Sequence, residues 1–147
     1  QIVIGGHSAA VERAIALLRE RGVRKVARLA VSVPSHTPLM RDAANRLAEA
    51  MHGVAWHAPA LPVVQNVDGE VHDGTQAIRD ALVRQLYLPV QWTQCVQALA
   101  GRGVTRLAEC GPGKVLTGLA KRIDKSLEAR ALGSVPDFTS ALQEWSA

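Results

Sequence analysis

Apolar positions in the first part of the chain switch between continuous runs and a helical spacing. Residues 1–4 and residues 26–33 form two largely apolar runs. Between them, apolar residues recur at i, i+3, i+4 and i+7, at Val11, Ala14, Ile15 and Leu18. Gly22 suits the position just after a helix end. The pattern predicts a strand, a helix and a strand, which form a βαβ unit.

A proline ends the second run, and a new helix is predicted directly after it. Thr37 suits the N-cap of this helix, and Pro38 suits its first position. The apolar residues of the face that it buries are Met40, Ala43, Ala44, Leu47 and Met51, and Gly53 ends the helix. Further on, residues 62–67 predict a buried strand, which is followed by a turn at Asp68 and Gly69.

The next helix has signals at both of its ends. Asp73, with Gln76 three residues later, predicts a capping box at its start. Its inward positions are Ile78, Ala81, Leu82 and Leu86. The helix must stop near Leu88, because Pro89 disfavours the α conformation for the residue before it. Gln85 therefore lies in the last turn, where backbone carbonyls lack partners within the helix.

Strands and helices continue to alternate in the last third of the chain. We predict a helix from Pro89, a strand over 105–109, a helix that runs from the Gly-Pro-Gly-Lys segment at 111–114 through Ile123, a strand over 129–132 and a helix from Pro136. Because strands alternate with helices throughout, the predicted fold class is α/β with mainly parallel strands.

Composition limits the kinds of protein to consider. The 147 residues are 48% hydrophobic and 20% charged, as in a globular domain, and no apolar run approaches the roughly 20 residues of a membrane helix. The net charge is +4, with basic clusters over 19–28 and 121–130. These clusters indicate a solvated helix face, or else a surface for an acidic protein or a phosphate-bearing substrate. Nucleic acid is disfavoured because no aromatic residues are interleaved for base stacking.

Several residues have side chains that could carry chemistry. His36 follows a predicted strand and precedes a helix, at the edge of an α/β sheet where ligands bind, and it is either an acid–base group or a partly buried histidine satisfied by the backbone. His52 and His57 lack the i, i+4 partner of a helical metal site, so no metal is expected there. Cys95 and Cys110 suit free thiols in a reducing compartment.

The Gly-Pro-Gly-Lys segment at 111–114 suggests a phosphate-binding loop at first sight. The first glycine of such a loop would fall on Ala108, and Val115 stands where a serine or threonine must hold Mg²⁺. We therefore predict a tight strand-to-helix elbow, with backbone N–H groups that could face a ligand.

An ordered set of segments resembles the C-terminal half of the bacterial malonyl-CoA:acyl-carrier-protein transacylases. The segments are VSVPSH at 31–36, PVVQNVD at 62–68, AIRDALVRQLY at 77–87, PVQW at 89–92 and GPGKVLTGL at 111–119. The resemblance implies an α/β-hydrolase-like parallel-sheet core preceded by the closing βαβ of a ferredoxin-like small lobe. Residues 1–33 would end the lobe, and residues 34–147 would form the C-terminal part of the core.

The resemblance also implies an activity. A transferase of this family moves malonyl from malonyl-CoA to a serine and then to the phosphopantetheine thiol of acyl carrier protein, in bacterial, cytoplasmic fatty acid biosynthesis. It implies no cofactor beyond these two substrates, no metal, and no nucleic-acid or membrane partner. A free-standing enzyme is expected rather than a polyketide synthase module.

Four positions match residues to which the family gives a role. His36 matches the catalytic histidine, and Gln85 matches the residue whose backbone carbonyl orients it. Ser35 matches a position that lines the acyl pocket, and Gln1 resembles a glutamine near the coenzyme A path. The basic face at Lys121 and Arg122 could meet acidic acyl carrier protein.

The sequence also departs from the family. It contains no Gly-x-Ser-x-Gly nucleophile motif, and it lacks the arginine that pairs with the malonyl carboxylate and the glutamine of the oxyanion hole. We expect these in an N-terminal half absent from the sequence, so the chain alone is predicted to be inactive and to associate through exposed strand edges. The alternative is a non-catalytic α/β module that binds a carrier protein or an acyl ligand.

Overall fold

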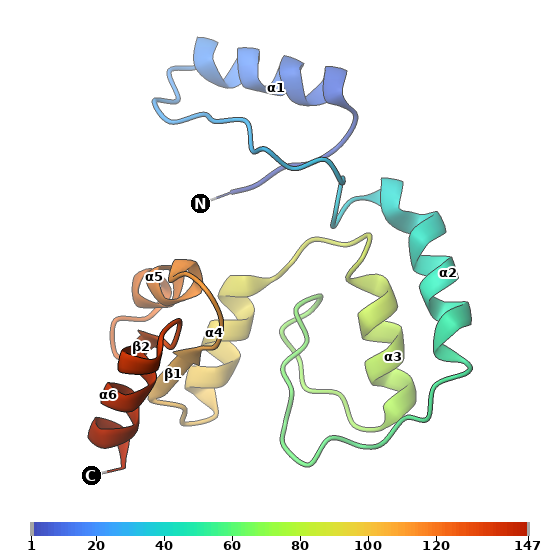
Figure 1. Ribbon diagram of the computed structural model, residues 1–147. Coiled ribbons are helices and arrows are strands. Elements are labelled where there is room, and N and C mark those ends of the chain that lie inside the picture. Colours follow the sequence, from blue (N-terminus) through green and yellow to red (C-terminus); the bar gives the residue numbers. More distant parts are fainter. Residues whose placement is uncertain (1, 147) are drawn as a thin grey trace. The chain divides into compact units, whose positions relative to one another are not determined.

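The computed structural model describes residues 2–146, whose helices and strands are labelled in Figure 1. The elements are α1 (Ser8–Glu20), the short 3-10 helix η1 (Pro38–Met40), α2 (Arg41–Met51), α3 (Thr75–Arg84), α4 (Trp92–Gly101), β1 (Arg106–Glu109), α5 (Val115–Ile123), β2 (Glu128–Ala131) and α6 (Val135–Trp145). The chain divides into two compact units: Gln1–Leu61 with His72–Val90, and Pro62–Val71 with Gln91–Ala147. The fold class is α/β, as predicted.

In the first unit, α1 ends where the sequence predicts. Gly22 has φ +77°, and its N–H donates to the carbonyl of Arg19 at 2.9 Å. The N–H of Val23 donates to the carbonyl of Leu18 at 3.0 Å. These two bonds form a Schellman motif, in which a glycine tolerates the left-handed conformation that closes the helix.

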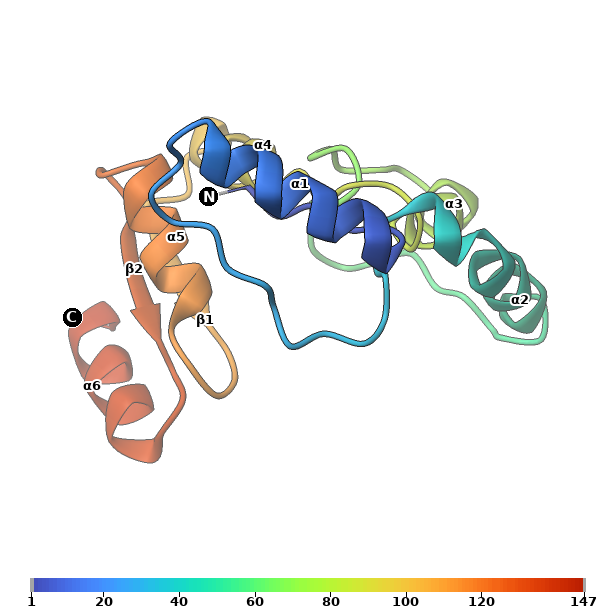
Figure 2. The ribbon, with the colours of Figure 1, turned by 90° about the horizontal axis from the view of Figure 1, so that it is seen from above.

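The two strands predicted around α1 are not formed. Residues 2–4 and 26–33 have no regular secondary structure, and Figure 2 shows the segment after α1 running as a loop. A strand needs a neighbour for its backbone N–H and C=O groups, and nothing in the part of the chain that the structure describes pairs with these segments. The prediction of a βαβ unit is therefore wrong for these residues. The boundary predicted between residues 33 and 34 is not tested by the two units and stays a prediction.

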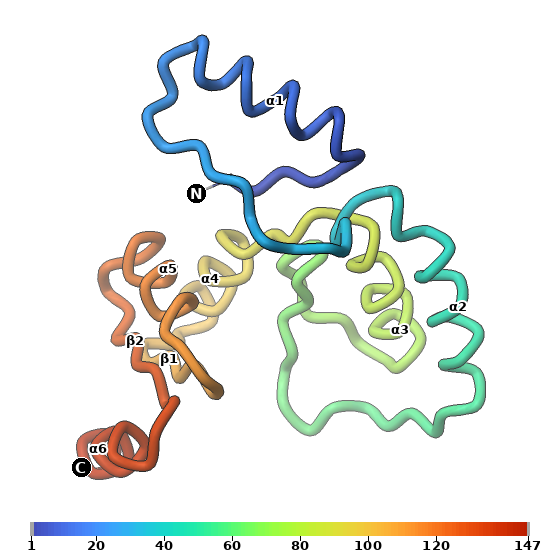
Figure 3. Tube along the Cα trace, turned by 45° about the horizontal axis from the view of Figure 1, so that its top comes forward, coloured from blue at the N-terminus to red at the C-terminus, as the bar shows by residue number. Residues whose placement is uncertain are grey.

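Helices α2 and α3 lie side by side in the first unit, as Figures 1 and 3 show. Ala44 and Ala81, at 0% and 1% exposure, are small enough to let two helices approach closely. The predicted start at Pro38 is confirmed, although the first turn is a 3-10 helix. Since aromatic residues make up only 3% of the chain, small aliphatic side chains fill this core.

The capping box predicted for α3 is wrong. The helix begins at Thr75, and Gly74, with φ +86°, occupies the N-cap without a side-chain capping bond. The side-chain amide of Gln76 instead donates to Asp80 at 2.9 Å, one turn along the helix. The helix ends before Pro89, as predicted, but it stops at Arg84 rather than near Leu88, so Gln85 is its C-cap and not part of its last turn.

The second unit contains a parallel pair of strands. β1 pairs with β2, and Leu107 lies opposite Ala129. Both strands and the helix α5 between them were predicted, with ends that differ by at most one residue from 105–109 and 129–132. The fully buried Val96 of α4 and Ala120 of α5 form the core beside them.

The strand predicted over 62–67 is reduced to a single bridge between Val64 and Val71. The intervening turn is closed by the N–H of Gly69, which donates to the carbonyl of Gln65 at 2.8 Å. Helix α4 begins at Trp92 rather than Pro89, because the N–H of Gln91 donates to the carbonyl of Asn66 at 2.7 Å. This turn therefore positions the start of α4.

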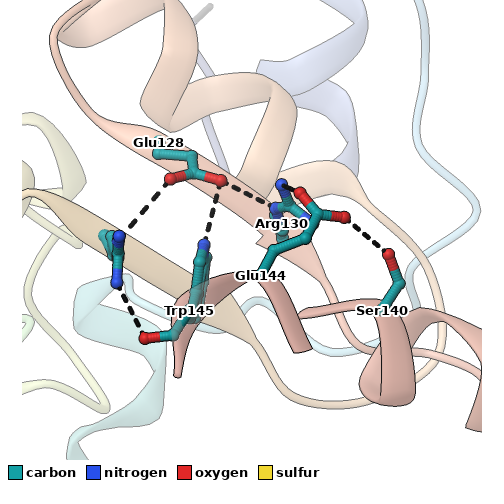
Figure 4. A network of polar contacts seen from close by, with 6 residues as sticks. Glu128, Arg130, Ser140, Glu144 and Trp145 are labelled. Atoms are coloured by element: carbon teal, nitrogen blue, oxygen red, sulfur yellow. Dashed lines mark hydrogen bonds and ion pairs between the residues drawn. The ribbon is translucent and has the colours of Figure 1, made fainter. Parts of the chain in front are cut away.

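Helix α6 follows β2 after a short connection, visible in Figure 2. Figure 4 shows the polar network that joins the two elements. Arg130 binds both Glu128, at 2.8 Å, and Glu144, and the indole N–H of Trp145 donates to Glu128 at 2.9 Å. Among the helices of residues 2–146, none has the length and apolar character that crossing a bilayer requires.

Candidate active site

His36 lies in the tight turn that precedes η1, where two carbonyl groups hold it. Its backbone N–H donates to the carbonyl of Leu86 at 2.9 Å. Its ring Nδ1 lies 2.6 Å from the carbonyl oxygen of Gln85. Two hydrogen bonds from His36, to the carbonyls of the successive residues Gln85 and Leu86, therefore join this turn to the end of α3.

The contact with Gln85 decides which ring nitrogen carries the proton. A carbonyl oxygen only accepts hydrogen bonds, so Nδ1 must be the N–H donor. In the neutral ring this leaves the Nε2 lone pair free to accept a proton. The His36 side chain is exposed, which makes Nε2 accessible. The sequence also allowed a partly buried histidine that bonds the backbone. The backbone bond is present, but the residue is exposed rather than partly buried.

The end of α3 supplies the acceptors for local reasons. Helix C-termini leave carbonyls without intrahelical partners, and the proline at 89 prevents another turn of helix. The carbonyls of Gln85 and Leu86 are therefore free to accept from the His36 turn. A neutral carbonyl stabilises an imidazolium less than a carboxylate would.

The backbone of His36 is in the left-handed region, with φ +62°. It is the only residue other than glycine with positive φ among residues 2–146. Residues with a Cβ are uncommon there, and such outliers cluster at functional sites. No sequence pattern predicted this conformation.

Thr37 contributes to this turn in a way that the sequence did not predict. It stands at the N-cap position, but its hydroxyl makes no capping bond. The hydroxyl donates instead to the carbonyl of Pro34 at 2.7 Å, and the residue is 7% exposed. A Cβ built on Gly5 would lie 2.9 Å from the Thr37 Cγ2 methyl, so Gly5 and Thr37 are in close contact.

Ser35 and Gln1 are the other predicted site residues. Ser35 is exposed next to His36, and its N–H donates to the carbonyl of Val33 at 2.8 Å. Its role in an acyl pocket stays a prediction. Gln1 lies outside the described residues.

A carboxylate caps the helix that follows the elbow at 111–114. Glu109 accepts from the N–H of Leu116 at 3.2 Å, and from the N–H and the hydroxyl of Thr117, both at 2.8 Å. The hydrogen bonds from Thr117, led by its backbone N–H, lower the pKa of Glu109. Glu109 therefore occupies the N–H groups at the start of α5, where the helix dipole favours a negative charge. The idea that N–H groups of residues 111–114 face a ligand stays a prediction.

The other histidines and the two cysteines singled out in the sequence do not form a second site in the described part of the chain. His52 and His57 are exposed, and within residues 2–146 no three potential ligands gather into a metal site. Cys95 is buried with its thiol 3.6 Å from the carbonyl of Gln65, and this burial raises its pKa. Cys110 is exposed, and neither cysteine forms a disulfide.

The basic clusters are exposed, as a solvated face should be, except for the half-buried Arg130, which binds Glu128 and Glu144. In the first cluster, Arg28 donates to Glu12 at 2.6 Å. In the second, Lys121 and Arg122 are exposed on the last turn of α5, and Arg122 donates to the carbonyl of Gly118 at 3.1 Å. Their role in binding a partner stays a prediction.

Known proteins resemble the chain over nearly its whole length. It is 51% identical over 143 residues to the malonyl CoA-acyl carrier protein transacylase of Escherichia coli K12, and 36% identical to that of Bacillus subtilis. Each alignment covers 97% of this chain, but only 46% and 45% of the relatives. The predicted resemblance to the malonyl-CoA:acyl-carrier-protein transacylases is confirmed. No protein-family model matches the chain.

Solved transacylases agree with the sequence relatives. The crystal structure of the transacylase from Xanthomonas oryzae pv. oryzae is 72% identical, with a TM-score of 0.93 over 95% of this chain and 45% of that one. A malonyl-transacylase in complex with a type II polyketide synthase acyl-carrier protein is 46% identical, with a TM-score of 0.90 over the same shares. The chain spans about half the length of the curated transacylases that it matches.

Proposed function

We propose that this chain supplies the general base of an acyl-carrier-protein S-malonyltransferase, and that this base is His36. The observation that carries the proposal is the exposed ring whose Nδ1 donates to Gln85 at 2.6 Å, which leaves Nε2 free to take a proton. The similarity to transacylases over 97% of the chain supports the same function.

In the first half-reaction, a serine hydroxyl attacks the thioester carbonyl of malonyl-CoA. Nε2 of His36 takes the hydroxyl proton as the new C–O bond forms. The C–S bond then breaks, and the imidazolium gives its proton to the departing coenzyme A thiolate. The products are a malonyl ester of the enzyme and free coenzyme A, with neutral His36 restored.

The second half-reaction reverses these roles. The phosphopantetheine thiol of acyl carrier protein attacks the malonyl ester, and Nε2 takes the thiol proton. When the C–O bond breaks, the imidazolium returns this proton to the serine oxygen. Because the acyl group passes only between thioester and ester, the reaction needs no cofactor beyond the two substrates.

The other predicted residues act around this base. Gln85 is a positioning residue, since its carbonyl fixes the tautomer and orientation of the ring. Ser35, next to His36, lines the acyl pocket in this proposal. The assignment of Gln1 to the coenzyme A path stays a prediction, because Gln1 lies outside the described residues. Acyl carrier protein approaches the exposed basic side chains of Lys121 and Arg122.

The nucleophile belongs to a different part of the enzyme. The sequence holds no Gly-x-Ser-x-Gly motif, and the chain spans about half the length of its transacylase relatives. We infer that the serine and the malonyl-binding arginine come from an N-terminal half, and that the chain without it is inactive. The assembled enzyme is a cytoplasmic, bacterial acyltransferase of fatty acid biosynthesis.

Replacement of His36 tests the function. In the complete polypeptide as the cell produces it, His36→Ala should lower malonyl transfer to acyl carrier protein by about 10²–10⁴-fold, the usual contribution of a positioned acid–base group. His52→Ala, at another exposed histidine, should leave transfer unchanged. The measurement is the mass increase of the carrier protein with time. Undiminished transfer by His36→Ala would exclude the proposed base.

The absence of a nucleophile motif favours one second candidate, a module that binds a carrier protein or an acyl ligand without catalysis. The intact mass of the expressed polypeptide separates the two candidates. A mass well above that of 147 residues, with serine-dependent malonylation, supports the transferase. A mass of 147 residues, with carrier-protein binding that survives His36→Ala, supports the module.

A further inference from the structure

The left-handed backbone of His36 is held by more than the hydrogen bonds that His36 itself makes. At φ +62° its Cβ is crowded by the neighbouring carbonyl, so the surrounding structure must hold it there. The two bonds to Gln85 and Leu86 hold the residue from one side only, that of α3. Groups that close the turn itself must provide the rest.

The hydroxyl of Thr37 closes this turn. It donates to the carbonyl of Pro34 at 2.7 Å, so it joins the residue after His36 to a residue two positions before it. Thr37 is 7% exposed, and water therefore competes little for this bond. The hydroxyl serves no capping role, which leaves the bond to Pro34 as the one that it donates.

The methyl group of Thr37 has a second role in the same turn. A Cβ on Gly5 would lie 2.9 Å from Thr37 Cγ2, closer than real Cβ contacts come. The same Cβ would lie 3.9 Å from the carbonyl oxygen of Ser35. The segment at Gly5 thus supports the turn from the side of the Thr37 methyl.

From these contacts we infer that Thr37 is a positioning residue for His36. Its hydroxyl closes the turn from Pro34, and its methyl sits against the backbone of Gly5. Together they keep His36 in the left-handed conformation in which its ring reaches the Gln85 carbonyl. The effect on malonyl transfer rests on the proposed function, whereas the effect on the ring does not.

Removal of the hydroxyl alone is the first test. Thr37→Val keeps the branched shape and loses the donor to Pro34, whereas Thr37→Ser keeps the donor and loses the methyl. In the complete polypeptide, Thr37→Val should lower kcat for malonyl transfer by about 10–100-fold, with a smaller change in KM for malonyl-CoA, because the base is misplaced. Thr37→Ser should retain kcat within about threefold, because the serine hydroxyl can still donate to Pro34.

The second test uses the contact with Gly5. Gly5→Ala should lower kcat because its methyl meets Thr37 Cγ2, and Gly5→Ala with Thr37→Ser should recover most of the loss because that carbon is gone. Gly6→Ala is the matched control, since a Cβ on Gly6 meets nothing within 4 Å. Failure of Thr37→Ser to rescue Gly5→Ala would overturn the inference, even if Thr37→Val proved unable to fold.

A readout independent of activity separates this inference from the proposed function. The ¹⁵N chemical shifts of the His36 ring report its tautomer, and the Nδ1–H form should dominate in the parent and fall in Thr37→Val. An unchanged tautomer in Thr37→Val would overturn the inference and leave the proposed function standing. Undiminished transfer by His36→Ala would overturn the function, while a changed tautomer would still support the role of Thr37.

Discussion

At the scale of single residues, the site depends on backbone groups more than on a second charged side chain. His36 is oriented by the carbonyl of Gln85, and its backbone is held by that of Leu86. No carboxylate is needed to fix the tautomer, because a helix-end carbonyl is an obligate acceptor. The side chain of Gln85 takes no part in this bond, so Gln85→Ala should leave the ring orientation intact.

Glycine positions give a stability prediction at the same scale. Gly69 has φ +73°, and an added Cβ would lie 2.8 Å from Cβ of Gln94. Gly69→Ala should therefore lower the free energy of unfolding by about 1–3 kcal/mol. Gly101, at the end of α4 with open space around it, is the control, and Gly101→Ala should be neutral or stabilising by up to about 1 kcal/mol. Urea unfolding measures both, and equal effects would contradict the steric argument.

At the scale of elements, carboxylates fix two helices of the second unit. Glu109 at the end of β1 holds the start of α5, where the helix dipole favours a negative charge. Glu144 of α6 is bound by Arg130 of β2 and accepts from Ser140 at 2.9 Å. Each contact links an element to a strand of the parallel pair, so both should weaken when the carboxylates are protonated.

The attachment of α6 gives a pH prediction. The hydrogen bonds from Arg130 and Ser140 lower the pKa of Glu144 to about 2. A group with a lowered pKa in the folded state contributes stability above its unfolded pKa, and that contribution is lost as the pH falls toward the folded pKa. Glu144→Gln should therefore lower the urea midpoint near neutral pH, and the difference from the parent should shrink between about pH 5 and about pH 2. A difference independent of pH would contradict this account.

At the scale of the whole molecule, large apolar side chains remain uncovered. Ile2 is 91% exposed and Val31 is 66% exposed, in the two segments that were predicted to be strands. Apolar surface with unpaired backbone promotes association between chains. The same uncovered segments explain why α1 has no buried residue despite its apolar stripe.

This exposure predicts that the isolated 147-residue chain self-associates. Sedimentation velocity at rising concentration should show dimers or larger species, and Val31→Lys should reduce them because a charge disfavours strand pairing. Gln97→Lys adds the same charge at an exposed polar position, and it should leave the association unchanged. A chain that stays monomeric at every concentration would contradict the prediction.

Local sequence signals were enough to predict several of the helices and the end of α3. The apolar periodicity predicted α1, α2 and α5, and Pro89 predicted the end of α3 and hence the free carbonyl of Gln85. These features depend on residues within one or two helical turns of each other. Two such signals failed. At the predicted capping box, Gln76 bonds Asp80 one turn along the helix, and the strands at 2–4 and 26–33 have no partner among the described residues.

Contacts between residues far apart in the chain settled the rest. The bond from His36 to Gln85 spans 49 positions. The left-handed backbone of His36 could not be predicted without the position of that carbonyl. Even over shorter spans the partner was not predictable: the hydroxyl of Thr37 bonds Pro34 instead of capping η1, and Glu109 caps the start of α5. Side-chain hydrogen bonds have several possible partners in any sequence, and packing in three dimensions selects among them.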